Sequence, residues 1–227
     1  VVRHAEFTGR SGGMFGFEGL GCIYWHMVSK LLLAVQETFF RAVRQACSEE
    51  DRKALGNLYY RVRQGIGFNK SPAEYGAFPT DPYSHTPKHA GASQPGMTGQ
   101  VKEELLTRFG ELGIRIDEGT VTFEPCLLRV REFGEAAATF TYLDVRGDWC
   151  NLAVEPGGLA FTWCQVPVVY QLVDRASVEL QVHWLDGSVD TFDRLVLTAE
   201  ATRQLFMRTG LISKLVLRFN RSCLFDT

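Results

Sequence analysis

Residues 99–125 read GQVKEELLTRFGELGIRIDEGTVTFEP, and the period of the apolar residues changes within this stretch. Before Gly113 the apolar residues share one helical face, and Gly113 can end the helix because glycine readily adopts the left-handed conformation of a helix C-terminus. From Ile114 onward apolar and polar residues alternate, which indicates β-strand. The stretch therefore predicts a boundary between a helical part, residues 1–113, and a β-rich part, residues 114–227. The apolar residues on the helical face are Val101, Leu105, Phe109 and Leu112.

Two further helices are predicted before this boundary. The first covers residues 23–47; it is apolar nearly all round at its start and then carries a narrower apolar stripe, which is typical of a long, largely buried helix. Ser48, with Asp51 three residues later, resembles a capping box and opens a second helix that ends near Gly65. The short connection predicts an antiparallel helical hairpin.

The β-rich part contains several segments of period two bounded by turn signals. Asp186-Gly187 is a hairpin signal, and residues 199–210 read as a short helix or turn before the last strand. Sequential strands with short turns favour an antiparallel β-sandwich. The predicted fold class is therefore α+β, with a helical hairpin and a third helix followed by a sandwich. The strand-like segments are residues 114–125, 127–133, 138–147, 159–173, 177–197 and 214–220.

The composition limits the classes of partner that this protein is expected to bind. The 227 residues are 45% hydrophobic, enough for a substantial core. The formal net charge is −2, from 24 basic and 26 acidic residues, so no global field favours nucleic acid or an acidic membrane surface. Small neutral ligands remain open, and the candidate residues and the resemblance given below make a carbohydrate the expected one.

The six cysteines are scattered without a C-x-x-C pair, which favours reduced thiols in an intracellular, cytoplasmic protein over an oxidised framework. The chain shows no secretory leader, although it begins without Met and could be trimmed. Its longest apolar run, around residues 31–35, is too short for a membrane span.

A long polar loop, residues 66–99, separates the second and third predicted helices. Its later portion, residues 78–100, reads FPTDPYSHTPKHAGASQPGMTGQ and holds four of the eight prolines and two of the five histidines. Loops of this length are uncommon unless they are functional or disordered, so we expect this one to line a pocket. The candidate ligand-binding residues in and before it are Lys70, Glu74, Tyr83, His85, His89 and Gln94.

Two carboxylates are candidates for catalysis of glycosyl transfer, which needs an acid to protonate the leaving oxygen. Asp81 and Glu18 could form such a pair if the loop folds over the start of the first helix, although Asp81 before Pro82 also fits a turn. Tyr24, Trp25 and His26 form an aromatic and polar cluster that could stack on a sugar ring or belong to the core.

Other chemistries have weaker signals. His85 and His89 have helical metal-pair spacing, but Pro87 between them argues against a helix, so no metal site is predicted. No cofactor motif is present, and none is implied. In the β-rich part, four residues could line a sugar groove but alternate with apolar residues as core residues do. They are Trp163, Tyr170, His183 and Trp184.

The run QPGMTGQVKEELLTRFGELGIRIDEGTVTFEPCLL, residues 94–128, resembles the end of the helical toroid in six-hairpin glycosidase-like proteins. It is most similar to glycoside phosphorylases of the cellobiose phosphorylase type. There a glycine-rich turn leads into a last core helix, a short strand ending in proline and a strand-rich cap. Residues 17–37, FEGLGCIYWHMVSKLLLAVQE, are similar to a toroid helix whose N-terminal end faces a sugar site.

The resemblance covers residues 14–145 and implies that the chain holds the closing quarter of a toroid, since a complete one has twelve helices. It implies a glycoside hydrolase or phosphorylase-like enzyme that acts by acid-assisted glycosyl transfer with inversion. The family's catalytic acid lies in an earlier hairpin, and no motif of this chain matches it. Two alternatives stay open: a non-catalytic carbohydrate-binding protein, and a structural homodimer that buries the apolar first helix.

Overall fold

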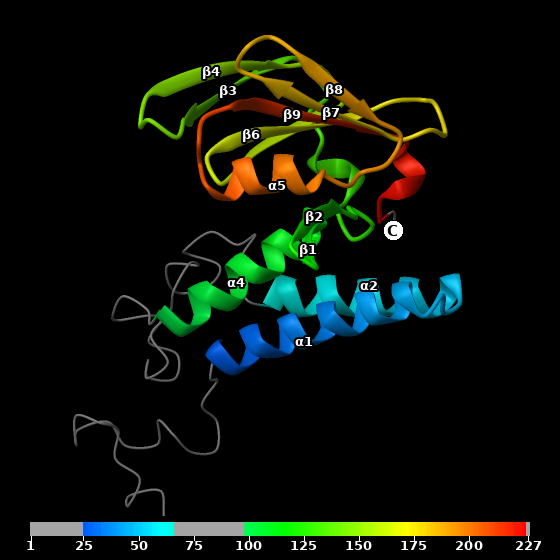
Figure 1. The fold of residues 1–227 in the computed structure, drawn as a ribbon. Helices are drawn as coiled ribbons and strands as arrows, with labels where there is room; N and C mark the ends of the chain where they lie inside the picture. Colours follow the sequence, from blue (N-terminus) through cyan, green and yellow to red (C-terminus); the bar gives the residue numbers. More distant parts are fainter. Residues whose placement is uncertain (1–24, 66–97, 226–227) are drawn as a thin grey trace, which may run out of the picture. The chain divides into compact units, whose positions relative to one another are not determined.

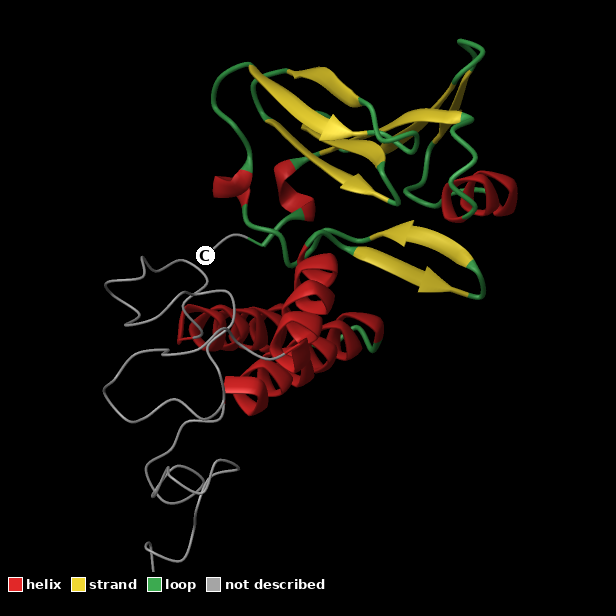
Figure 2. Ribbon diagram, turned by 90° about the vertical axis from the view of Figure 1, so that its left-hand side faces the viewer, coloured by secondary structure: helices red, strands yellow, loops and turns green. Residues whose placement is uncertain are grey.

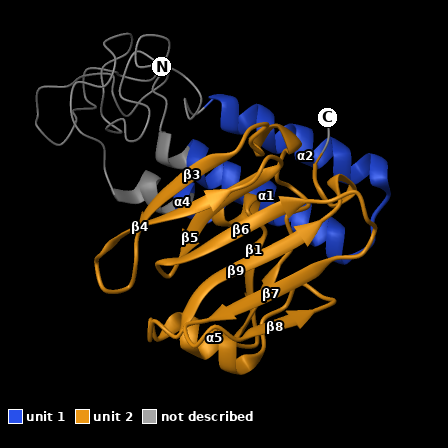
Figure 3. Cartoon of the chain, turned by 90° about the horizontal axis from the view of Figure 1, so that it is seen from above, with its two compact units in different colours: residues 1–108, 227 blue, residues 109–226 orange. Residues whose placement is uncertain are grey.

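The computed structural model describes residues 25–65 and 98–225, without side chains at 25–27 and 98–103. The chain divides into two compact units, one formed by residues 1–108 with residue 227 and the other by residues 109–226 (Figure 3). Each unit has its own buried residues and is described separately.

The first unit contains a helical hairpin made of α1 (Trp25–Arg44) and α2 (Glu49–Gly65) (Figure 1). Their interface buries large side chains such as Phe39 and Tyr59. A third helix, α4 (Thr98–Glu111), begins in this unit, and the buried Gln36 amide donates to the Thr107 carbonyl at 2.7 Å. The predicted hairpin and third helix are thus confirmed.

Half of the predicted capping box is seen at the start of α2, where the Ser48 side chain caps the helix. The Asp51 backbone N–H donates to the Ser48 hydroxyl at 3.1 Å, and that hydroxyl donates to the Asp51 carboxylate at 2.6 Å. This arrangement satisfies an amide that has no partner within the helix and fixes the start of α2.

The second unit is mostly strand (Figure 2). It contains two two-stranded sheets, β1-β2 and β3-β4, and a five-stranded sheet with the order β5-β6-β9-β7-β8. The strands are β1 (Ile114–Asp117), β2 (Thr120–Phe123), β3 (Ala138–Leu143), β4 (Trp149–Val154), β5 (Gly158–Trp163), β6 (Val166–Leu172), β7 (Glu179–Trp184), β8 (Val189–Phe192) and β9 (Ile212–Phe219). The helices are η2 (Val130–Glu132), α5 (Ala199–Phe206) and η3 (Arg221–Cys223).

The two faces of the five-stranded sheet differ in character. One face packs residues such as Leu180 and Leu217 against Leu205 of α5 and Val121 of β2, and all four are buried. The opposite face carries the alternate residues of β7 and β9. They include Glu179, Gln181, His183, Lys214 and Arg218.

The β3–β4 hairpin lies over this opposite face, on the side away from α5 (Figure 1). A Cβ added to Gly158 of β5 would lie 2.5 Å from the Val154 Cγ1 atom of β4, so the glycine lets the hairpin approach the sheet. The sheet is therefore covered by helix on one face and by a hairpin on part of the other.

The α+β class and the largely antiparallel pairing are confirmed, with one refinement. β6 pairs with β9 in parallel, so the five-stranded sheet is mixed. The strand expected at residues 127–133 is wrong, because Leu127 and Leu128 are adjacent and both fully buried, and η2 follows them. The strand β4 was not predicted.

Within residues 25–65 and 98–225, no helix combines the length and the apolar character that crossing a membrane requires.

Candidate functional site

Most of the predicted site residues lie outside the described residues. This holds for the candidate catalytic pair Glu18 and Asp81 and for the loop, so these assignments remain predictions. Trp25 and His26 are the first two residues of α1, where only the backbone is described. The remaining predicted binding residues outside the described part are Tyr24, Lys70, Glu74, Tyr83, His85, His89 and Gln94.

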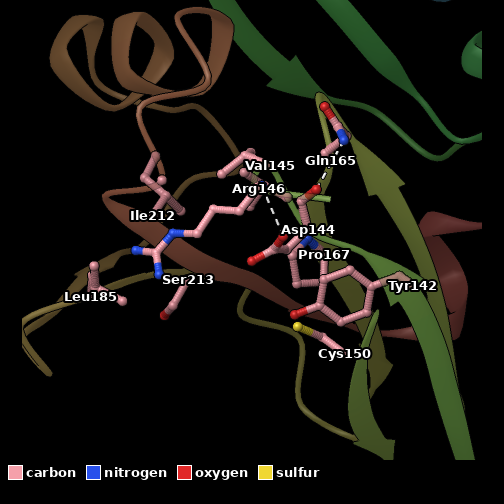
Figure 4. Close-up of a pocket in the computed structure, with 12 residues that line it drawn as sticks. Tyr142, Asp144, Val145, Arg146, Cys150, Gln165, Pro167, Leu185, Ile212 and Ser213 are labelled. Atoms are coloured by element: carbon pink, nitrogen blue, oxygen red, sulfur yellow. Dashed lines mark hydrogen bonds between the residues drawn. The ribbon is translucent and has the colours of Figure 1, made fainter. Parts of the chain in front are cut away.

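A pocket of about 190 Å³ lies within the second unit, between the β3–β4 hairpin and the five-stranded sheet (Figure 4). The hairpin contributes the end of β3, the turn that follows it and one residue of β4. The sheet contributes the β5–β6 turn, the start of β6 and the start of β9. The polar lining residues are Tyr142, Asp144, Arg146, Cys150, Gln165 and Ser213.

Asp144 organises the turn that forms the hairpin side of the pocket. Its Oδ1 atom accepts the backbone N–H groups of Arg146 at 2.8 Å and Asp148 at 2.9 Å. These amide hydrogen bonds, that of Asp148 first, lower the pKa of the Asp144 carboxyl below its ordinary value. Asp144 therefore carries a negative charge at neutral pH.

Tyr142 and Cys150 occupy facing positions on β3 and β4, on the side of the hairpin that faces the pocket. Burial raises the pKa of the Tyr142 phenol, and the nearby Cys150 thiol and Asp144 carboxylate act in the same direction. The phenol therefore stays protonated and can donate or accept a hydrogen bond.

The sheet side of the pocket is held in place by hydrogen bonds to the backbone. The Gln165 amide donates to the Asp144 carbonyl at 2.9 Å, which ties the β5–β6 turn to the hairpin turn. The Ser213 hydroxyl donates to the His183 carbonyl at 3.0 Å. Arg146 extends across the pocket toward Ser213 (Figure 4). Hydrogen bonds to backbone carbonyls thus orient the Gln165 and Ser213 side chains at the pocket.

This arrangement suits binding better than hydrolysis. Glycoside hydrolysis needs two carboxyl groups about 5 to 10 Å apart, one of them protonated. Asp144 is the one acidic side chain among the described residues that line the pocket, and its lowered pKa makes it a poor general acid. Planar amide, carboxylate and guanidinium groups beside an aromatic ring can instead bind the hydroxyls of a small polar ligand.

The structure places the four candidate sugar-groove residues of the β-rich part in different surroundings. Tyr170 is fully buried, and Trp163 packs edge-on against Phe109 at 4.7 Å between ring centroids, so the core interpretation holds for both. Trp184 is partly buried, and its indole N–H donates to Asp190 at 2.8 Å. His183 lies on the sheet face opposite the core, where burial and the Lys214 charge lower its pKa.

Reasoning from the sequence missed the pocket residues. The only signal for the hairpin turn is the segment LDVRGDW, residues 143–149, in which Asp144 precedes Gly147 by three residues. Gln165 and Ser213 carry no local signal, because they reach the pocket through strand pairing.

In the described part of the chain, no cluster of three or more His, Cys, Asp or Glu side chains is arranged to hold a metal ion. No protein-family model matches this sequence, and a search of curated proteins found no match.

Proposed function

We propose that the chain is a carbohydrate-active protein, the C-terminal part of a glycoside hydrolase or phosphorylase-like enzyme, with a sugar-binding pocket in its second unit. The observation that carries the sugar-binding part of this proposal is the composition of that pocket. A phenol, an amide, a hydroxyl, a carboxylate and a guanidinium converge on it.

The size of the pocket favours a ligand of one ring. Its volume of about 190 Å³ lies below the roughly 300–1,000 Å³ of sites for drug-sized ligands. A single sugar unit is small, is rich in hydroxyls and has an apolar face. In the proposed complex the Tyr142 ring contacts that face, while the Tyr142 phenol, Gln165 and Ser213 bind hydroxyls.

The catalytic part of the proposal depends on residues outside the described part of the chain. The resemblance of residues 94–128 to glycoside phosphorylases supports an enzyme. The loop at residues 78–100 would then line a second sugar pocket, with Asp81 and Glu18 as acid and base.

A non-catalytic carbohydrate-binding protein is the second candidate. It is favoured by the single carboxylate in the pocket, which is sufficient for binding but not for the two-carboxylate mechanism. In both cases we propose a cytoplasmic location, since Cys47, Cys150, Cys164 and Cys223 are free thiols, as expected in a reducing compartment.

Titration of the full chain with D-glucose, D-mannose and D-xylose, followed by amide NMR shifts, tests the binding proposal. We expect shifts in residues 144–150, 165–167 and 210–213. Tyr142→Phe and Ser213→Ala should each weaken binding by about two- to tenfold, the usual worth of one hydrogen bond. Thr191→Val, exposed on β8 and outside the pocket, is the matched control. Shifts elsewhere, or no binding of any sugar, would contradict the proposal.

Turnover separates the two candidates. Incubation with cellobiose and inorganic phosphate should release a sugar phosphate if the chain contains a complete phosphorylase site. Glu18→Gln and Asp81→Asn should each abolish release of glucose by hydrolysis, and the variant that removes the acid should also abolish the sugar phosphate, without weakening binding in the pocket. Binding without any turnover would contradict Asp81 and Glu18 as a catalytic pair of this chain.

A further inference from the structure

The β3–β4 hairpin has a second surface, on the side turned away from the pocket. Because side chains alternate along a strand, the residues between the pocket-facing ones point to this other side. All six are exposed and none is charged, in a protein where 22% of residues are charged. We call this surface the hairpin outer face; its residues are Thr139, Thr141, Leu143, Trp149, Asn151 and Ala153.

Trp149 is the dominant side chain of the hairpin outer face. It is 73% exposed and lies opposite Leu143, which is 41% exposed. Phe140 and Tyr142, on the pocket-facing side, are partly buried and stacked at 5.6 Å between centroids. The aromatic packing of the hairpin therefore lies on its inner side, while the Trp149 ring is largely exposed on the other side.

Hydrogen-bonding groups lie beside the indole. Thr141 and Asn151 face each other across the strands, and the Thr141 hydroxyl donates to the Asn151 Oδ1 atom at 2.7 Å. This bond orients the Asn151 amide and leaves its two N–H donors available. Asn151 follows Trp149 by two residues, so the two side chains stand about 7 Å apart on the same face. That distance is close to the width of one pyranose ring.

We infer that the hairpin outer face is a binding surface for a neutral oligosaccharide, with one sugar ring stacked on Trp149 and its neighbour hydrogen-bonded to Asn151 and Thr141. An aromatic face matches the C–H face of a pyranose, while amide and hydroxyl groups match its hydroxyls. The absence of charge favours a neutral chain, and the exposed Asp148 beside Trp149 disfavours an anionic one. This inference rests on the proposed carbohydrate function but concerns a different surface from the pocket.

A sugar fits this face better than a protein partner. Stable protein interfaces bury about 800 Å² on each side around a cluster of apolar anchors. The hairpin outer face offers two large apolar side chains and is otherwise made of small and polar residues. A flat, open strand surface also suits a chain of rings better than a single one.

The test uses cellohexaose, a neutral hexasaccharide whose rings present flat C–H faces, with the full chain and tryptophan fluorescence or calorimetry as the readout. We expect saturable binding that Trp149→Ala weakens at least tenfold and Trp149→Phe largely retains. Asn151→Ala should weaken it about two- to tenfold. Met207→Ala is the matched control, because Met207 is also exposed, at 63%, and lies outside the hairpin and the pocket.

The outcomes separate this inference from the proposed function. Equal affinity of wild type and Trp149→Ala overturns the inference. The proposed function then still stands if single sugars bind in a way sensitive to Tyr142→Phe. Stronger binding of hexagalacturonate than of cellohexaose overturns the assignment of a neutral ligand. A dimer in light scattering that Trp149→Ala dissociates shows that a second copy occupies the face instead. Absence of binding by every sugar overturns both proposals.

Discussion

Gly113 is the residue on which the junction between α4 and β1 depends. Its φ is +76°, and an added Cβ would lie 2.2 Å from the Glu124 carbonyl carbon. We expect Gly113→Ala to lower the free energy of unfolding by about 2–5 kcal/mol, from left-handed strain and from steric overlap with backbone that cannot easily move. Urea unfolding monitored by circular dichroism measures the loss.

Gly119 provides the control for this substitution. It has nearly the same φ, +77°, but no atom lies within 4 Å of an added Cβ. Gly119→Ala should therefore show the strain alone, about 1–2 kcal/mol. Equal losses for the two variants would show that the contact with Glu124 is not important.

The role of Gly113 was only half visible in the sequence. A glycine after an apolar helical stripe predicts a helix end, and α4 does end at Glu111. The approach to Glu124 follows from the pairing of β1 with β2, where Ile114 lies opposite Phe123. Local sequence shows the conformation that a residue needs but not the atoms that surround it.

Among the elements, α5 depends on the residue that precedes it, Thr198, for its start. The Thr198 hydroxyl accepts the Ala201 N–H at 3.1 Å, and the helix places Ala201 and Leu205 in the core. Thr198→Ala should lower the free energy of unfolding by about 0.5–2 kcal/mol, the usual worth of an N-cap. Thr198→Ser, which keeps the hydroxyl, should retain most of the wild-type free energy of unfolding when both variants are unfolded in urea. Equal stability of the two variants would contradict the cap.

The elements that sequence predicted well are those with local signals. The α1–α2 hairpin has an apolar stripe and a capping box, and the Asp186-Gly187 turn joins β7 to β8 as expected. β4 alternates in burial, but two of its three exposed residues, Trp149 and Ala153, are apolar, so the sequence shows no alternation of apolar and polar residues there. The pocket was missed for a related reason: its two sides come from segments that meet only when β3–β4 covers the sheet.

For the second unit as a whole, we expect stability to fall as the pH is lowered. His183 has a pKa lowered by burial and by the charges of Lys214 and Arg218, so its neutral form is favoured in the folded state. The unfolded chain then binds more protons below about pH 6.5, and stability decreases there. Hydrogen bonds from Arg175 and Arg218 lower the pKa of Glu179. The stability that its ionised form contributes is therefore lost at lower pH, below about 4.

Urea midpoints at pH 7.5, 5.5 and 3.5 measure this dependence. His183→Gln should reduce the drop in the urea midpoint between pH 7.5 and 5.5 and leave the drop between pH 5.5 and 3.5. Glu179→Gln should do the reverse, at the cost of its ion pairs with Arg175 and Arg218. A stability that rises on acidification would contradict both assignments.

The order of the five-stranded sheet, β5-β6-β9-β7-β8, has a consequence for synthesis. β9 comes last in sequence among these strands but sits at the centre, so the earlier four can form only two separate hairpins until it arrives. A ribosome must release residues 212–219 before the sheet can close, and each hairpin exposes an unpaired edge until then. Chains that stop short of Ile212 should therefore be recognised by chaperones and proteases as incomplete, whatever the state of their helices.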